Sequence, residues 1–153
     1  MNEDNLNKLI DLLKYNNLII SVVESCTGGL LSHQFTKYPG SSDFFIGGII
    51  AYNKSVKMNI LGLDKNIPVV SKECSEQLVI GLKNIIDSDI QISVTGYAGP
   101  GAEPIEMLGT IYYSILFKNK IVTTKKIFNH SSRYLNCISI INCIIDDLIK
   151  IIN

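Results

Sequence analysis

Apolar residues along the chain occur in two patterns, helical repeats and short continuous runs. The first repeat predicts an amphipathic helix over residues 3–15. Its apolar positions are Leu6, Leu9, Ile10, Leu12 and Leu13. Residues 18–23 then form a run rich in β-branched side chains, which is typical of a strand covered on both faces. The chain therefore begins with a helix followed by a buried strand.

The same patterns continue to the C-terminal end. A second buried strand is expected over 44–52, where Gly47 and Gly48 indicate a bulge or a close approach of another backbone. Further strands are expected over 90–95, 109–117 and 121–128, the last two forming a hairpin that turns at 118–120. Further helices are expected over 27–37, 54–61 and 72–87, with Asn53 and Ser71 capping the last two, and from Ser131 or Ser132 onward. The final helix carries an apolar stripe of Ile138, Ile141, Ile145, Leu148 and Ile152.

This alternation of helices and strands indicates the fold class. Helices that alternate with buried strands, with one added hairpin, predict an α/β fold: a three-layer α/β/α sandwich with a mixed, mostly parallel sheet. We expect one domain over residues 1–153, because this length buries enough surface to fold without a metal or a disulfide.

Composition narrows the classes of partner. The chain has 14 basic and 14 acidic residues, so no net field attracts nucleic acid or an anionic membrane. No stretch has the roughly 18 apolar residues of a membrane span, and the start Met1-Asn2-Glu3-Asp4 lacks the basic residues of a secretory signal. We therefore expect a cytoplasmic protein that binds neither nucleic acid nor membrane.

Cysteine and histidine spacing gives no metal site. Cys26, Cys74, Cys137 and Cys143 contain no C-x-x-C pair, and His33 and His130 lack ligand spacing. We expect reduced thiols, no disulfide framework, no metal and no cofactor.

The segment Glu24-Ser25-Cys26-Thr27-Gly28-Gly29 is the main candidate for chemistry. It places a hydroxyl and a thiol where a predicted strand gives way to a predicted helix. The first N–H groups of a helix have no partner within the helix, so those of Cys26 to Gly29 could stabilise a developing oxyanion. The turn therefore suits a nucleophile.

Two further loops should lie beside this turn, because ligands of open α/β sheets bind at the carboxyl ends of strands. They are residues 52–57 and the glycine loop 96–101. A serine needs a base, and neither histidine lies in these segments. Lys57, with a pKa lowered by partial burial, could accept the proton alone or with the Tyr52 hydroxyl as a relay.

Several motifs, in order, resemble the C-terminal domain of the CinA (competence-damage-inducible protein) family. Beside the Ser25 segment they are Pro39-Gly40-Ser41-Ser42 with Phe44 and Phe45, Ala51-Tyr52-Asn53 with Lys57, Val70-Ser71, Gly96-Tyr97-Ala98-Gly99-Pro100 and Leu108-Gly109-Thr110. The family includes stand-alone amidohydrolases that convert nicotinamide mononucleotide to nicotinate mononucleotide and ammonia. The resemblance implies the same fold, Ser25 as nucleophile, and Tyr52 and Lys57 as its activating partners.

The resemblance also implies a small-molecule pyridine nucleotide as ligand and a homo-oligomer. The positions expected to bind substrate are Cys26, Thr27, Gly28, Gly29, Gly96, Ala98, Gly99, Gly109, Thr110 and Arg133. Larger members carry an N-terminal, metal-dependent pyrophosphatase domain that lies outside this resemblance, so it gives no reason to expect a metal here.

Two departures from the family pattern bear on substrate choice. Glu106-Met107-Leu108 stands where many members carry Lys-Pro-Val, and Cys137 stands where a second arginine often follows the residue matching Arg133. Both changes could weaken phosphate binding.

Three other interpretations remain open. Ser25 could serve only as a helix cap, and the glycine loop only as a tight turn. Cys26 could be the nucleophile of a thiol-dependent hydrolase, because a helix N-terminus lowers a thiol pKa. The chain could also be a pyridine-nucleotide-binding module with little or no turnover.

Overall fold

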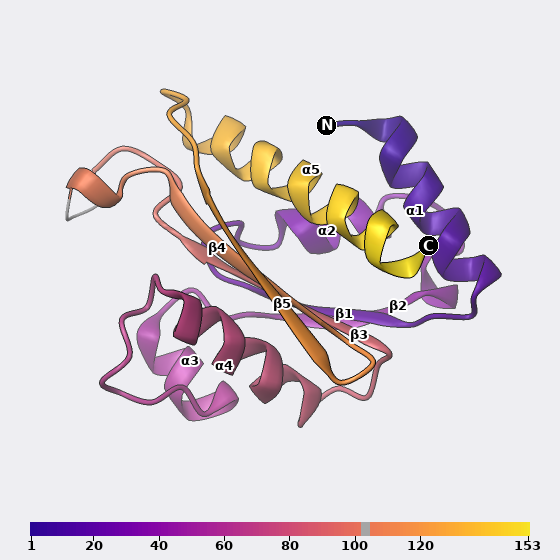
Figure 1. The fold of residues 1–153 in the computed structure, drawn as a ribbon, viewed down its shortest axis with the longest axis horizontal. Helices are drawn as coiled ribbons and strands as arrows, with labels where there is room; N and C mark the ends of the chain where they lie inside the picture. Colours follow the sequence, from indigo (N-terminus) through magenta and orange to yellow (C-terminus); the bar gives the residue numbers. More distant parts are fainter. Residues whose placement is uncertain (102–104) are drawn as a thin grey trace.

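A five-stranded sheet lies between two layers of helices (Figure 1). The computed structural model describes residues 1–101 and 105–153. Its strands are β1 (Ile20–Glu24), β2 (Phe45–Ile50), β3 (Ile90–Gly96), β4 (Thr110–Phe117) and β5 (Lys120–Ile127). Its α-helices are α1 (Glu3–Tyr15), α2 (Leu30–Thr36), α3 (Lys54–Leu61), α4 (Lys72–Lys83) and α5 (Arg133–Ile152), with short 3₁₀ turns η1 (Ser41–Asp43) and η2 (Ile105–Met107).

The strand order is β2-β1-β3-β4-β5. Strand β1 pairs in parallel with both β2 and β3, whereas β4 is antiparallel to β3 and to β5. Four of the five strands therefore run in one direction, which confirms the predicted mixed, mostly parallel sheet. The β4–β5 turn places Lys118 and Asn119 at φ 50° and 61°, the positive values that a two-residue hairpin turn requires.

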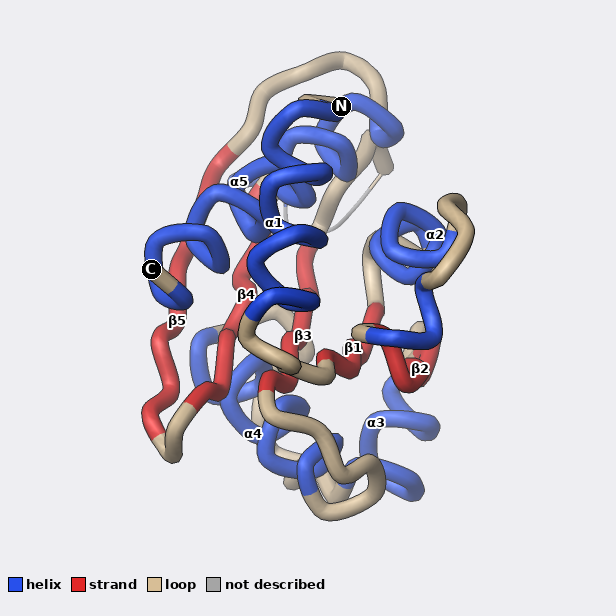
Figure 2. The backbone as a smooth tube through the Cα atoms, turned by 90° about the vertical axis from the view of Figure 1, so that its right-hand side faces the viewer, coloured by secondary structure: helices blue, strands red, loops and turns tan. Residues whose placement is uncertain are grey.

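The helices divide between the two faces of the sheet. Helices α1, α2 and α5 cover one face, and α3 and α4 cover the other (Figures 1 and 2). Successive side chains of a strand point to opposite faces, so Ile20 and Val22 of β1 join the larger core under α1 and α5, while Val23 packs with α4. The predicted three-layer sandwich is confirmed. Within the described ranges, no helix has the length and apolar character needed to cross a membrane.

Local sequence signals located most helix starts correctly. Asn53 and Ser71 cap α3 and α4 as predicted, each accepting a backbone N–H two or three residues later, and Ser132 caps α5 in the same way. The predicted end of the helix capped by Ser71, at residue 87, is wrong. Helix α4 ends at Lys83, and Ile85 is exposed.

Helix α2 begins later than its predicted start at residue 27. Gly28 and Gly29 have φ values of 58° and 101°, so these residues form a left-handed turn rather than the first helical turn. The helix consequently starts at Leu30 and is seven residues long. Residues 25–29 form a loop at the end of β1.

Strand β2 is an edge strand and is not buried on both faces as predicted. Its residues alternate between partly covered and exposed, with Ile46 and Ile50 more than half exposed. The bulge is present: Ile20 and Ser21 pair with Phe45 and Gly47, so one residue of β2 is skipped. A Cβ on Gly48 would lie 2.8 Å from the backbone carbonyl oxygen of Val22, which confirms the close approach of another backbone.

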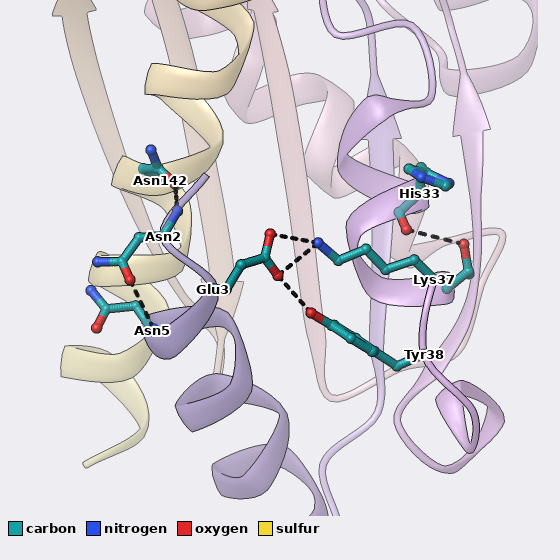
Figure 3. A network of polar contacts seen from close by, with 8 residues as sticks. Asn2, Glu3, Asn5, His33, Lys37, Tyr38 and Asn142 are labelled. Carbon is teal, nitrogen blue, oxygen red and sulfur yellow. Dashed lines mark hydrogen bonds and ion pairs between the residues drawn. The ribbon is translucent and has the colours of Figure 1, made fainter.

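Glu3 joins the start of α1 to the end of α2 (Figure 3). Its carboxylate accepts hydrogen bonds from Lys37 Nζ at 2.8 Å and from the Tyr38 hydroxyl. The Lys37 and Tyr38 hydrogen bonds lower the pKa of Glu3 below its ordinary value. The interaction tethers two helices of the same layer at an exposed site.

We expect Glu3→Gln to lower the free energy of unfolding by less than about 1 kcal/mol near neutral pH, because the pair is exposed and solvent screens it. Since the pKa of Glu3 is lowered in the folded state, this contribution is present above the ordinary carboxyl pKa and is lost as pH falls through the lowered value. Urea unfolding of wild type and variant at about pH 7 and about pH 3 measures it. Asp11→Asn, at an exposed α1 position with no ion pair in the described chain, is the control. An equal loss at both pH values would contradict the assignment.

Candidate active site

A pocket of about 310 Å³ lies at the carboxyl ends of β1, β2 and β3. It brings together the three loops that the sequence singles out. The predicted residues that line it are Ser25, Cys26, Tyr52, Lys57, Gly96, Gly99 and Arg133. Lys54, Tyr97, Pro100 and Gly101 also line it, within the two predicted loops 52–57 and 96–101 but without a predicted role of their own. Val70, from the Val70-Ser71 motif, lines it as well, and the lining residues that the sequence analysis missed are Val69 and Thr95. No local sequence pattern identifies Val69, because it reaches the site from the segment before α4.

A buried hydrogen bond joins Ser25 and Lys57. The Lys57 Nζ lies 2.9 Å from Ser25 Oγ, although the two residues are 32 positions apart. Lys57 is only 2% exposed and Ser25 only 8% exposed. The amine and the hydroxyl are therefore paired away from bulk water.

The local fold around Lys57 fixes its amine. Strand β2 ends at Ile50, and Ala51 and Tyr52 connect it to Asn53, which caps α3. Lys57 then lies in the first turn of α3. The Nζ donates to the backbone carbonyls of Ala51 and of Tyr52, the latter at 3.0 Å. Two of its three hydrogen-bonding directions are thereby held by acceptors, and the third faces Ser25.

Burial lowers the pKa of Lys57 below its ordinary value, because the charged ammonium loses solvation. The neutral amine has a lone pair where the ammonium has its third N–H. In that form Lys57 can accept the proton of the Ser25 hydroxyl, which is the chemistry required of a general base.

The Tyr52 hydroxyl lies on a different part of the pocket wall. Tyr52 is 62% exposed, and its hydroxyl accepts a hydrogen bond from Arg133 Nη2 at 3.3 Å. The same nitrogen donates to the Cys26 carbonyl at 3.2 Å. Among the described residues, the phenol has no hydrogen bond to Ser25 or Lys57, so its role as a proton relay stays a prediction.

Glu24 is a buried carboxylate directly before the nucleophile position. It is fully buried and forms no ion pair within the described chain. Its oxygens instead accept hydrogen bonds from the backbone N–H groups of Gly29, Leu31 and Ser32 and from the Ser32 hydroxyl, at 2.6 to 3.1 Å. The carboxylate thereby occupies the positive end of α2 and fixes the turn that carries Ser25.

This use of Glu24 changes which groups can stabilise an oxyanion. The Gly29 N–H is bound to Glu24, and the Gly28 N–H donates to the Ser25 carbonyl. The N–H groups of Cys26 and Thr27 have no acceptor among the described residues. The candidate donors are therefore these two and not all four. Sequence reasoning gave Glu24 no role, although a carboxylate that ends an apolar strand just before two glycines is a visible signal.

The thiol of Cys26 is a poor candidate nucleophile. It is 5% exposed and belongs to the core, and burial raises its pKa to about 12. The thiolate is the reactive form, so a raised pKa makes this thiol less reactive. A helix N-terminus would have the opposite effect, because it lowers a thiol pKa. The side chain behaves as a small buried apolar group, and its backbone contributes to the pocket.

The remaining predicted positions lie outside the pocket lining. They are Thr27, Gly28, Gly29, Ala98, Gly109 and Thr110. Gly109 and Thr110 hold the glycine loop through Tyr97, whose carbonyl accepts from the Gly109 N–H and whose N–H donates to the Thr110 carbonyl.

The two departures from the family pattern also lie outside the pocket lining. Glu106 and Met107 belong to η2. Cys137 is buried on α5, and its Sγ lies 3.5 Å from the Cys26 carbonyl oxygen. The described part of the chain contains no group of three or more side chains placed to hold a metal ion.

Comparison with known proteins identifies the family. The family model described as the CinA C-terminal domain matches residues 2–150. The chain belongs to the CinA C-terminal domain family. Among curated CinA-like proteins, it is 37% identical over 125 residues to that of Thermotoga neapolitana and 41% identical over 122 residues to that of Leptospira borgpetersenii. These alignments cover 78% and 76% of this chain but 31% and 29% of the relatives, so the chain spans about a third of their length.

Solved CinA superfamily structures share the fold. A Klebsiella pneumoniae protein matches with a TM-score of 0.91 at 22% identity, covering 97% of this chain and 96% of that one. An Enterobacter cloacae protein matches with a TM-score of 0.90 at 25% identity, covering 97% and 90%. The CinA sandwich is thus preserved at low sequence identity.

We expect Glu24→Gln to destabilise the Ser25 turn. The amide removes the charge and turns an NH2 group toward backbone donors, which should lower the free energy of unfolding by about 2 to 3 kcal/mol. Hydrogen exchange at the amide of Leu31 or of Ser32 should accelerate selectively, because these N–H groups bond different carboxylate oxygens and glutamine keeps only one of them. Glu73→Gln, at an exposed position in the first turn of α4, is the control. Unchanged protection of both amides would contradict this role of Glu24.

Proposed function

We propose that the protein hydrolyses the carboxamide of nicotinamide mononucleotide to nicotinate mononucleotide and ammonia. The observation that carries the proposal is the buried hydrogen bond between Lys57 Nζ and Ser25 Oγ, with the lysine pKa lowered by burial. A serine paired with a desolvated amine is a nucleophile with its own base. Membership of the CinA family suggests a function related to pyridine nucleotides, which supports the proposal.

The proposed reaction has two proton-balanced halves. Neutral Lys57 takes the Ser25 hydroxyl proton as Oγ attacks the amide carbon, and the N–H groups of Cys26 and Thr27 stabilise the oxyanion. Lys57 then returns the proton to the departing nitrogen, releasing ammonia and leaving an ester on Ser25. Lys57 next removes a proton from water, which attacks the ester, and gives that proton back to Ser25 Oγ as the carboxylic acid departs.

The charges at the pocket support an anionic nucleotide as substrate. Arg133 and Lys54 both line it, and the guanidinium of Arg133 reaches across from α5 to the carbonyl of Cys26. A phosphate near Arg133 would complement this charge, while the carboxamide faces Ser25. The Tyr52 hydroxyl, already bonded to Arg133, would then help to orient the guanidinium.

Ammonia release from nicotinamide mononucleotide tests the proposal. We expect Ser25→Ala and Lys57→Met each to lower kcat by at least about a thousandfold, because nucleophile and base act as one unit. Cys26→Ala should retain turnover, and Lys8→Met, at an exposed α1 position, is the control for loss of a lysine. Equal rates for wild type and Ser25→Ala would remove Ser25 from the mechanism. Nucleotide binding measured by calorimetry without any ammonia release would instead favour the binding module without turnover.

The pH dependence of kcat/KM tests the base. Below the pKa of Lys57 its amine is protonated and cannot accept the Ser25 proton, so the rate should rise with pH and level above that pKa. Because burial lowers the pKa of Lys57, the rising limb should lie below the ordinary lysine value of 10.5. Two results would contradict Lys57 as the base. One is a kcat/KM that keeps rising as pH passes 10.5, and the other is a kcat/KM without a rising limb.

A further inference from the structure

Two donors from helix α5 hold the backbone carbonyl of Cys26. Arg133 Nη2 donates to this oxygen at 3.2 Å, and the Cys137 thiol donates to it with Sγ at 3.5 Å. Arg133 and Cys137 are four positions apart, so they lie on the same face of the helix. Burial raises the pKa of the Cys137 thiol, which keeps the thiol protonated and able to donate. The proposed hydrolysis assigns no role to Cys137.

The held carbonyl belongs to the central peptide of a tight turn. The Gly28 N–H donates to the Ser25 carbonyl at 3.2 Å, which closes a β-turn over residues 25–28 with the Cys26–Thr27 peptide at its centre. Turn types I and II differ in the rotation of this central peptide, and type II requires a positive φ at the third residue. The φ of Thr27 is not positive. The central peptide therefore does not have the type II orientation, which would strain a β-branched residue.

The direction of the Cys26 carbonyl also sets the direction of the Thr27 N–H. In a trans peptide the N–H points away from the carbonyl oxygen. The carbonyl is held from α5, whereas Lys57 bonds Ser25 Oγ from α3, on the opposite face of the sheet (Figures 1 and 2). The Thr27 N–H therefore points away from α5, to the side from which Lys57 reaches Ser25. This N–H has no acceptor among the described residues.

We propose that Arg133 and Cys137 are positioning residues that preset the Thr27 N–H as an oxyanion donor. The inference rests on the Ser25 chemistry of the proposed function, in which this N–H stabilises the oxyanion. Without the two α5 donors the central peptide can rotate, which would turn its carbonyl oxygen toward the developing negative charge. The cost falls on the transition state and not on substrate binding, so kcat should change while KM does not.

Ammonia release from nicotinamide mononucleotide tests Cys137. Cys137→Ala removes the donor and should lower kcat about tenfold with KM unchanged. Cys137→Ser replaces the thiol with a hydroxyl donor and should keep kcat within about twofold of wild type. Cys143→Ala, at a half-buried position of the same helix, is the control for loss of a thiol. Equal kcat for wild type and Cys137→Ala, or equal losses for both Cys137 variants, would overturn the role of Cys137.

Binding of 3-pyridylboronic acid reads the same geometry without turnover. Ser25 Oγ adds to the boron as Lys57 accepts the hydroxyl proton, and the resulting tetrahedral anion places an oxygen where the oxyanion would form. Calorimetry should show about tenfold weaker binding to Cys137→Ala than to wild type. The probe carries no phosphate, so Arg133→Met should also weaken its binding about tenfold, through loss of the contact with the Cys26 carbonyl. Ser25→Ala gives the baseline without the adduct.

The two measurements separate this inference from the proposed substrate. If the wild type releases no ammonia but Cys137→Ala and Arg133→Met both weaken the boronate adduct, the proposed substrate is wrong and the inference stands. If the wild type forms no adduct, or if either variant binds the boronic acid as tightly as the wild type, the inference is overturned even where ammonia is released.

Discussion

The site depends on an amine that is held out of water beside a hydroxyl. Lys57 is buried between the carbonyls that end β2 and the side chain of Ser25. Removing the solvent from a lysine favours its neutral form, while the carbonyl acceptors limit that effect and keep the nitrogen in one place. The order of the elements allows this arrangement, because β2 leads directly into α3 beside the end of β1.

Glu24 stabilises the turn at the end of β1. A helix that starts next to a nucleophile offers its positive end to any anion, and a seven-residue helix has little stability of its own. The Glu24 carboxylate takes up most of that positive end from inside the core, which fixes the turn and leaves the N–H groups of Cys26 and Thr27 facing no protein acceptor. The N–H groups of Gly29, Leu31 and Ser32 therefore stabilise the turn, and those of Cys26 and Thr27 are left as candidate oxyanion donors.

Helix α5 joins the Ser25 region to the hairpin end of the sheet. Arg133 in its first turn contacts the Cys26 carbonyl and the Tyr52 hydroxyl, and Asn136 holds the glycine loop through Ala98. A Cβ on Gly99 would lie 2.5 Å from Arg133 Cβ, so the loop packs directly on this turn. The glycine loop and the helix therefore form one wall of the pocket.

The sequence by itself determined the features that local physics controls. Apolar spacing predicted the helix over 3–15, and short polar side chains marked the caps at Asn53 and Ser71. Positions at strand ends, together with the family motifs, marked Ser25, Tyr52 and Lys57 as candidate catalytic residues. Only the tertiary structure decided the rest. The placement of β2 at the sheet edge and the pairing of the Tyr52 hydroxyl with Arg133 depend on contacts between residues that are far apart in the sequence. Such contacts arise from strand order and core packing, and the local spacing of apolar residues does not determine either of them.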